Sequence, residues 1–207
     1  NIAIGWESSK WQKKKKSYTW DFLLKQLPFR HEEEKMRFVN HHTAHALSSY
    51  YVSGFDYSNI ISLDGYGGSE SGVLGIGEKD EFRVIKSIPN KSSWGHLYSE
   101  ITRMLGFKFH SDEGKVMGLA AYGQPIEDEF TFIDWSDDIP VIDKKGFTRY
   151  LSSLTPRAKG EELNQYHKDL AATVQRTLER AAIQMSSYLY NITGSKNLCM
   201  SGGCALN

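Results

Sequence analysis

The sequence contains little cysteine and no excess of charge of either sign. Two cysteines, Cys199 and Cys204, occur in 207 residues, which is too few for a disulfide framework, and their spacing does not fit a zinc ribbon. The 25 basic and 25 acidic residues cancel, so no net field favours DNA or an anionic membrane. We therefore expect a protein of the reducing cytoplasm that does not bind DNA.

Long apolar runs and internal repeats are also lacking. No stretch of about 18 apolar residues offers a membrane span, and no low-complexity linker divides the chain. The composition is 40% hydrophobic and 13% aromatic, which is enough for a folded core. The sequence thus predicts one globular unit over residues 1–207 that does not cross a membrane.

The two ends of the sequence favour a partial domain. Residue 1 is Asn and not Met. Residues 1–6 have a short apolar pattern, which we expect to be the later part of a strand. The last residues, Ser201 to Asn207, have a turn composition that should lead into another element. We expect a domain that is incomplete at both ends.

Apolar periodicity and turn residues predict an α/β domain with a mixed sheet and flanking helices. Strands are expected near 1–6, 37–39, 59–63, 72–77, 82–88 and 197–200, and helices near 18–26, 41–51, 94–105 and from about 170 to Gly194. The predicted buried helix faces are Leu97, Ile101, Met104 and Leu105, and then Leu170, Val174, Leu178, Ala181, Met185 and Leu189. Residues 125–160 are acidic and are interpreted as an irregular, peripheral insertion.

A pair of histidines suggests a metal site. His41 and His45 are four residues apart in an alanine-rich helix, so they share one face, whereas His42 points elsewhere. A third ligand, commonly a carboxylate, is not identified by the spacing. Surface histidines that only donate and accept hydrogen bonds remain the alternative.

The segment from Asp64 to Gly68 follows an apolar strand. Its glycines allow backbone N–H groups to approach an oxyanion, and Asp64 has the chemistry to hold Mg²⁺ or to orient a phosphate. A plain hairpin turn is equally compatible with Asp-Gly. The segment is therefore a candidate nucleotide contact through Asp64, Gly65, Gly67 and Gly68.

Two further glycine segments have the composition of anion or nucleotide sites. Gly114 and Lys115 open a short helical run without the spacing of a Walker loop. Gly202 and Gly203 follow a strand, where bare backbone can contact a nucleotide. Cys204, in the same turn, is interpreted as a small apolar residue and not as a nucleophile, because no activating partner can be assigned.

Taken together and in order, these segments resemble the carbamoyltransferase family typified by NodU and CmcH. The blocks that carry the resemblance are NHHTAHA, ISLDGYGGSESG, the 94–107 segment beginning WGHLYSE, EGKVMGLAAYG and LCMSGGCALN. They cover most of the chain outside residues 125–160, and five ordered blocks are more specific than any one of them.

The resemblance implies a catalytic domain of the actin-like ATPase (ribonuclease H-like) superfamily. It implies transfer of a carbamoyl group from carbamoyl adenylate to a hydroxyl of a small molecule or sugar. The adenylate would be made from carbamoyl phosphate and ATP by a separate C-terminal domain of the YrdC type. The family's metal ligands fall on His41 and His45, with Fe²⁺ or another divalent ion expected and Mg²⁺ as a further candidate. Its nucleotide contacts fall on Asp64, Gly65, Gly67, Gly68, Gly114, Lys115, Gly202, Gly203 and Asn207.

Several parts that the resemblance requires are not found in these 207 residues. The carboxylate that completes the metal site is expected after Asn207, and the adenylate-forming domain is not present. We therefore expect the chain alone to be inactive or nearly so. The group that deprotonates the acceptor is not assigned, with His96 and His110 as the histidines available.

Two other functions stay open. A threonylcarbamoyl transferase acting on tRNA has a similar nucleotide site, but the zero net charge and the acidic insertion argue against an RNA partner. A non-catalytic nucleotide-binding module would use the glycine turns alone and would bind no metal. The acceptor itself is not revealed by the sequence.

Overall fold

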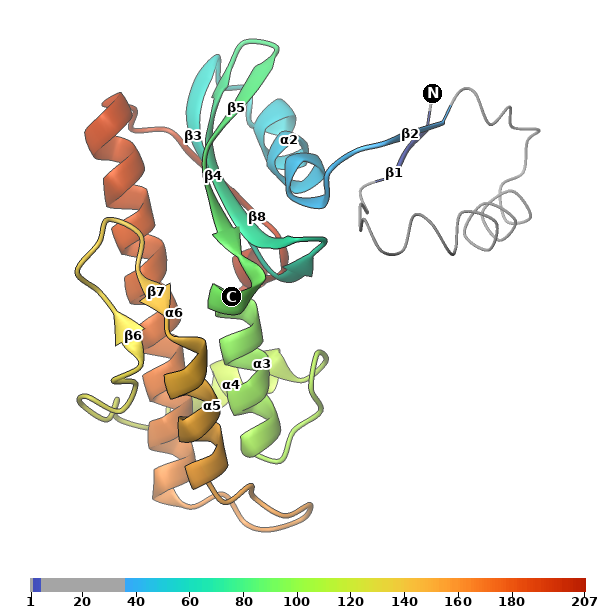
Figure 1. Ribbon diagram of the computed structural model, residues 1–207. Helices are drawn as coiled ribbons and strands as arrows, with labels where there is room; N and C mark the ends of the chain where they lie inside the picture. The colour runs from blue at the N-terminus through green and yellow to red at the C-terminus, as the bar shows by residue number, and fades with distance from the viewer. Residues whose placement is uncertain (1, 5–35) are drawn as a thin grey trace.

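The computed structural model describes residues 2–4 and 36–207 of the chain (Figure 1). The helix predicted near 18–26 lies outside these residues. The elements follow in the order β1 (Ile2–Ile4), β2 (Met36–Phe38), α2 (His41–Ser53), β3 (Tyr57–Gly67), β4 (Glu70–Glu78), β5 (Glu81–Pro89), η2 (Asn90–Ser92), α3 (Trp94–Met104), α4 (Glu113–Ala120), β6 (Ile133–Asp134), β7 (Val141–Ile142), α5 (Lys144–Ser153), α6 (Gln165–Thr193), β8 (Leu198–Ser201) and η3 (Gly203–Leu206).

The main sheet has four strands in the order β5-β4-β3-β8. Strands β3, β4 and β5 form an antiparallel meander, whereas β8 pairs parallel to β3, from Asn59 opposite Leu198 to Ser62 opposite Ser201. Strands β1 and β2 form a separate parallel pair. The predicted α/β class with a mixed sheet is therefore confirmed.

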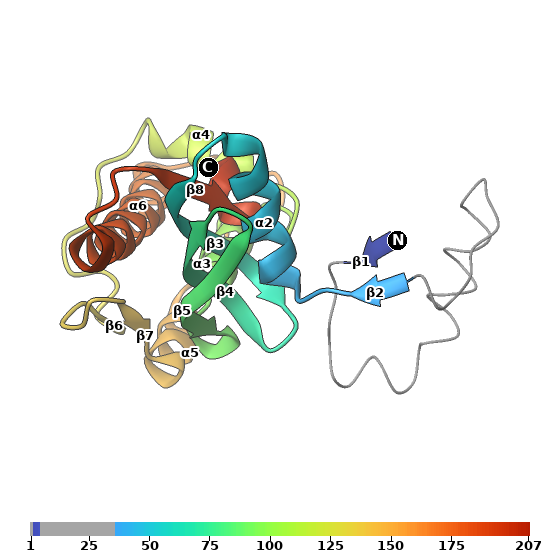
Figure 2. The same cartoon turned by 90° about the horizontal axis from the view of Figure 1, so that it is seen from above.

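Helices cover both faces of this sheet, as the view along its edge shows (Figure 2). Successive residues of a strand point to opposite faces, and β3 follows this rule. Ile60 packs with Ala46 and Tyr50 of α2 in a small cluster, while the neighbouring Ile61 belongs to a larger cluster with residues of α3 and α6. The sheet thus separates two hydrophobic cores.

The predicted helix faces are buried. Leu97, Ile101 and Met104 of α3 and the following Leu105 have exposed fractions of 4% or less. All six residues of the predicted stripe on α6 are buried as well. The cap residues fit these boundaries, because Asn164 and His167 form a capping box at the start of α6 and Gly194 ends it in the left-handed conformation.

Strand β3 is longer than predicted. It continues through Asp64 and Gly65 to Gly67, and the pairing with β4 shifts between Leu63 and Gly67. The chain reverses only after this point, where Gly68 has a φ of 86°. A hairpin turn does follow this strand, but it lies at Gly68 and not at Asp64-Gly65, because the shifted pairing with β4 lets β3 continue past Asp64.

The segment 125–160 differs from the expected irregular insertion. It contains β6, β7 and α5, and Phe130, Phe132 and Phe147 are buried in the larger core. Its acidic residues are mainly on the surface, while the aromatic residues between them supply apolar area. Among the residues with described structure, no helix is both long and apolar enough to cross a membrane.

Candidate metal and nucleotide site

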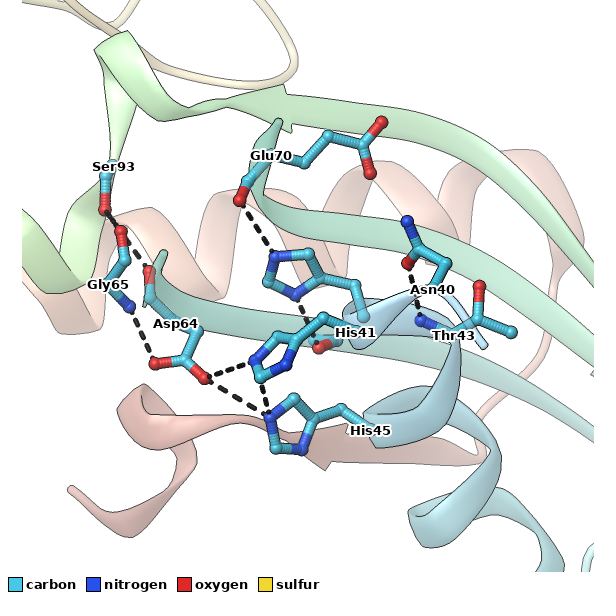
Figure 3. A network of polar contacts seen from close by, with 10 residues as sticks. Asn40, His41, Thr43, His45, Asp64, Gly65, Glu70 and Ser93 are labelled. Carbon is cyan, nitrogen blue, oxygen red and sulfur yellow. Dashed lines mark hydrogen bonds and ion pairs between the residues drawn. The ribbon is translucent and has the colours of Figure 1, made fainter. Parts of the chain in front are cut away.

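The N-terminal part of α2 presents two histidines to the end of β3. Asn40 caps the helix by accepting a hydrogen bond from Thr43 N at 3.0 Å. His41 and His45 are one helical turn apart, and both rings point at the carboxylate of Asp64 (Figure 3). Nε2 of His41 and Nε2 of His45 lie 3.2 and 3.3 Å from Asp64 Oδ2, and 3.1 Å from each other.

Asp64 is held so that one oxygen faces the histidines. Its Oδ1 accepts a hydrogen bond from Gly65 N at 2.7 Å, which leaves Oδ2 for the two rings. Burial opposes ionisation, but the Gly65 N–H and the neighbouring His41 outweigh it, so that the pKa of Asp64 is lowered. The carboxylate is therefore ionised at neutral pH.

The three ligand atoms fit one metal ion. An ion with bonds of about 2.0–2.2 Å separates neighbouring ligand atoms by roughly 2.8–3.6 Å in octahedral or tetrahedral geometry. The observed separations of 3.1–3.3 Å lie in this range. Two imidazoles and one carboxylate on one face of an ion form the ligand set of non-haem Fe²⁺ sites, and the set also suits Zn²⁺.

The carboxylate of this cluster was not anticipated as a metal ligand. Sequence reasoning assigned Asp64 to a nucleotide or to Mg²⁺ and expected the completing carboxylate after Asn207. Within the described part of the chain, Asp64 itself completes a group of three. The available signal was its position directly after the buried strand residues 58–63, since a side chain at a strand end can reach a neighbouring helix.

His42 has a structural role, and Gly67 makes room for it. His42 is buried, and its Nε2 donates to Glu70 O at 3.1 Å, so its Nδ1 accepts from Ser62 Oγ at 3.2 Å. Burial lowers the pKa of His42 and favours this neutral ring. A Cβ on Gly67 would clash with His42 Nε2 and would lie 2.5 Å from His41 Cδ2. Glycine at this position therefore lets the strand approach α2.

A pocket of about 620 Å³ adjoins the metal cluster at Asp64. The start of α3 packs directly on the end of β3, because a Cβ on Gly95 would lie 2.6 Å from Gly65 N. Ser93, the cap residue of α3, donates to Gly65 O at 2.7 Å. The volume is typical of a site for a small molecule or cofactor.

Only some of the residues predicted to contact a nucleotide line this pocket. Asp64, Gly65, Gly114, Gly203 and Asn207 do so.

The other four predicted residues lie elsewhere. Gly67 and Gly68 belong to the strand end and turn described above. Lys115 is exposed and forms an ion pair with Asp112 at 3.0 Å, and Gly202 packs on the backbone of Leu63 with a φ of 89°.

The pocket also contains residues that the sequence analysis did not single out. They come from β3, α3 and α4, namely Tyr66, Gly95, Tyr98, Ser99, Glu113 and Met117. All six lie within the blocks that carry the family resemblance, but their proximity depends on how α3 and α4 pack. Cys204 lines the same pocket, and burial, followed by the charge of Asp64, raises the pKa of its thiol to about 12. This agrees with its interpretation as an apolar residue.

Comparisons with known proteins agree with the sequence blocks. The family described as "Carbamoyltransferase N-terminus" matches residues 9–207. The nodulation protein NolNO of Sinorhizobium fredii is 36% identical over 184 residues, covering 85% of this chain and 26% of that protein. The nodulation protein NolO of Bradyrhizobium diazoefficiens is 34% identical over 177 residues, covering 82% of this chain and 32% of that protein.

A more distant relative is an uncharacterized protein of Methanocaldococcus jannaschii, 30% identical over 193 residues, with 81% of this chain and 30% of that protein covered. The chain spans between a quarter and a third of the length of these relatives. Since the family match extends over nearly all of the chain, this protein belongs to the carbamoyltransferase N-terminal family.

Proposed function

We propose that this chain is the part of an O-carbamoyltransferase that holds a metal ion and the nucleotide that carries the carbamoyl group. The group would pass from carbamoyl adenylate to a hydroxyl of a small molecule or sugar. The observation that carries the proposal is the His41–His45–Asp64 cluster, whose carboxylate also lines a pocket of about 620 Å³. A transferase needs both an electrophile activator and room for two reactants beside it.

The residues present suit the metal that this chemistry requires. His41, His45 and Asp64 would hold Fe²⁺ or another divalent ion. When bound, such an ion polarises the carbamoyl carbonyl as a Lewis acid. The Gly65 N–H fixes the carboxylate orientation, and the buried His42 supports the first turn of α2 against β3. These contacts pre-position the ligands before an ion arrives.

The pocket has features that favour a nucleotide. Gly114 and Gly203 bring bare backbone to its wall, and no atom lies within 4 Å of the position of a Cβ on Gly114. Backbone N–H groups of this kind bind phosphate oxygens. We propose ATP and carbamoyl adenylate as the ligands, with Mg²⁺ accompanying ATP, and a C-terminal YrdC-like domain of the whole protein as the source of the adenylate.

The sheet order supports a fold proposal. An antiparallel meander, β3 to β5, is followed by β8 parallel to the first meander strand, with helices on both faces. We propose that this arrangement is part of an actin-like ATPase (ribonuclease H-like) domain acting in the cytoplasm.

The decisive experiment compares two carboxylate variants in the whole protein. Asp64→Asn removes the anionic ligand while keeping the side-chain size, and Asp137→Asn removes an exposed carboxylate far along the chain. Bound metal is measured by mass spectrometry, and transfer by the label that reaches hydroxyl acceptors from ¹⁴C-carbamoyl phosphate with ATP.

We expect Asp64→Asn to lose metal affinity by more than about tenfold, together with transfer, while Asp137→Asn keeps both. Full metal binding and transfer in Asp64→Asn would contradict the metal assignment. A whole protein that binds ATP without metal and labels no acceptor would support the non-catalytic module.

A further inference from the structure

A second polar cluster lies in the same pocket and has no part in holding the metal. Ser99 of α3 is buried, with 4% of its surface exposed. Its Oγ lies 2.6 Å from Glu113 Oε1, at the start of α4, and 3.3 Å from His110 Nδ1, in the loop before α4. All three residues line the pocket together with Asp64.

The positions of the protons in this cluster follow from counting donors. An ionised Glu113 only accepts, so the single hydroxyl proton of Ser99 is directed to it across the short 2.6 Å contact. Ser99 Oγ then has only lone pairs to offer His110, and His110 Nδ1 must donate. In the neutral ring this leaves Nε2 unprotonated. That is the tautomer of a histidine ready to accept a proton.

The ring of His110 is also fixed in position. The ring of Phe109 lies 3.9 Å from it, measured between centroids, and the Tyr66 ring meets it edge-on at 6.3 Å. A Cβ on Gly65 would lie 3.4 Å from His110 Cε1, the carbon between the two ring nitrogens. The Cε1–Nδ1 edge of His110 therefore faces Gly65, the residue after Asp64, while Nε2 lies more than 4 Å from that Cβ position. His110 is exposed enough for a substrate to reach it.

On the basis of the proposed function, we infer that His110 Nε2 is the general base for the acceptor hydroxyl, and that Ser99 and Glu113 are positioning residues that hold its tautomer. The acceptor oxygen forms a bond to the carbamoyl carbonyl carbon. The bond from that carbon to the phosphate oxygen breaks, and its electron pair leaves with AMP. The hydroxyl proton passes to His110 Nε2 and then to solvent. The imidazolium is stabilised by Glu113 through Ser99.

The test uses the whole protein and measures transfer, metal content and nucleotide binding side by side. We expect His110→Ala to keep metal and nucleotide but to lose about 10²- to 10⁴-fold in kcat, the usual contribution of a general base. Added imidazole should restore part of the transfer to His110→Ala. Ser99→Ala should lower kcat more than it changes KM, whereas Ser152→Ala, an exposed serine of α5, should change neither.

A kcat within threefold of the parent in His110→Ala would overturn the inference while leaving the proposed function intact. If the parent protein itself transfers no carbamoyl group, the proposed function fails. The ¹⁵N chemical shifts of the His110 ring provide an independent check at neutral pH. We expect the Nδ1–H tautomer in the parent and its loss in Ser99→Ala, and a ring that is mainly Nε2–H in the parent would overturn the inference.

Discussion

Cys204 is a thiol beside Asp64 in the pocket, and its surroundings keep it protonated. Burial raises its pKa to about 12, whereas only the thiolate is a good nucleophile. We predict that iodoacetamide at pH 8 alkylates Cys204 on the order of a hundredfold more slowly than a free thiol. Peptide mass spectrometry distinguishes this site from Cys199, which is buried, whereas Cys204 is partly exposed in the pocket.

The replacement Cys204→Ala should leave transfer within about threefold of the parent, because the side chain acts as a small apolar group. Rapid alkylation of the folded protein, or a loss of transfer in Cys204→Ala, would instead make the thiol part of the chemistry.

The shared face of His41 and His45 could be predicted at the level of single residues, whereas their proximity to Asp64 could not. A spacing of four in a helix is enough to place His41 and His45 on one face. The meeting with Asp64 depends on how far β3 runs past its last regular pair with β4 and on how α2 lies against it. The pattern of apolar residues in the sequence shows neither the length of β3 nor the position of α2 against it.

The junction between α2 and β3 depends on the missing side chain at Gly67. A Cβ there would lie 2.5 Å from His41 Cδ2 and would push the helix from the strand. We predict that Gly67→Ala lowers the free energy of unfolding by about 1–3 kcal/mol and weakens metal binding. Urea denaturation and metal titration measure the two effects.

Gly118→Ala is the matched control for this change. Gly118 lies within α4, and nothing lies within 4 Å of the position of its Cβ. Alanine at this helical position should raise stability by about 0.5–1 kcal/mol. Equal effects of the two replacements would mean that contact with the histidines is not what requires glycine at position 67.

The start of α6 should respond to pH through His167. Its Nδ1 accepts a hydrogen bond from Asn164 N at 3.2 Å, which a protonated ring cannot do. Burial lowers the pKa of His167 below the free value of 6.5, with Glu161 opposing and Arg157 adding to the shift. The stabilisation is therefore complete above about pH 6.5 and is lost as the pH falls through the lowered pKa, by at most about 1.4 kcal/mol per pH unit.

The replacement His167→Gln keeps an acceptor that does not titrate, as in the usual capping box. We predict that the variant loses less unfolding free energy than the parent between pH 7.5 and 5.5 in urea denaturation. The same loss in both proteins would mean that this cap does not set the pH response.

At the scale of elements, the helices and the meander could be predicted from the sequence, but the pairing of β8 with β3 could not. The apolar stripes of α3 and α6 and their cap residues are local signals. The parallel pairing of β8 with β3 joins residues about 140 positions apart. The 125–160 segment was misjudged for a similar reason, because Phe130, Phe132 and Phe147 become core residues only when α5 docks.

At the scale of the whole chain, the balance of charge bears on the choice between the two proposed functions, transfer to a small-molecule hydroxyl and modification of tRNA. A tRNA partner requires several phosphate contacts, and each one steepens the dependence of affinity on salt. With 25 basic and 25 acidic residues, we predict weak tRNA binding, with a log–log salt slope corresponding to fewer than about three contacts. Fluorescence anisotropy between 50 and 200 mM salt measures it. A slope corresponding to six or more contacts would favour the tRNA-modifying alternative.

The metal cluster lies where α2 meets the sheet, beside the apolar contacts of the smaller core and the hydrogen bonds of His42 to Ser62 and Glu70. His41 and His45 belong to α2, whose Ala46 and Tyr50 pack in the smaller core, and Asp64 belongs to the strand that divides the two cores. An ion bound by all three would act as a cross-link closing a chain loop of 23 residues between His41 and Asp64. By analogy with other cross-links, such closure stabilises the folded chain by roughly 3 kcal/mol. The ion proposed to activate the substrate would then also hold the helix to the sheet.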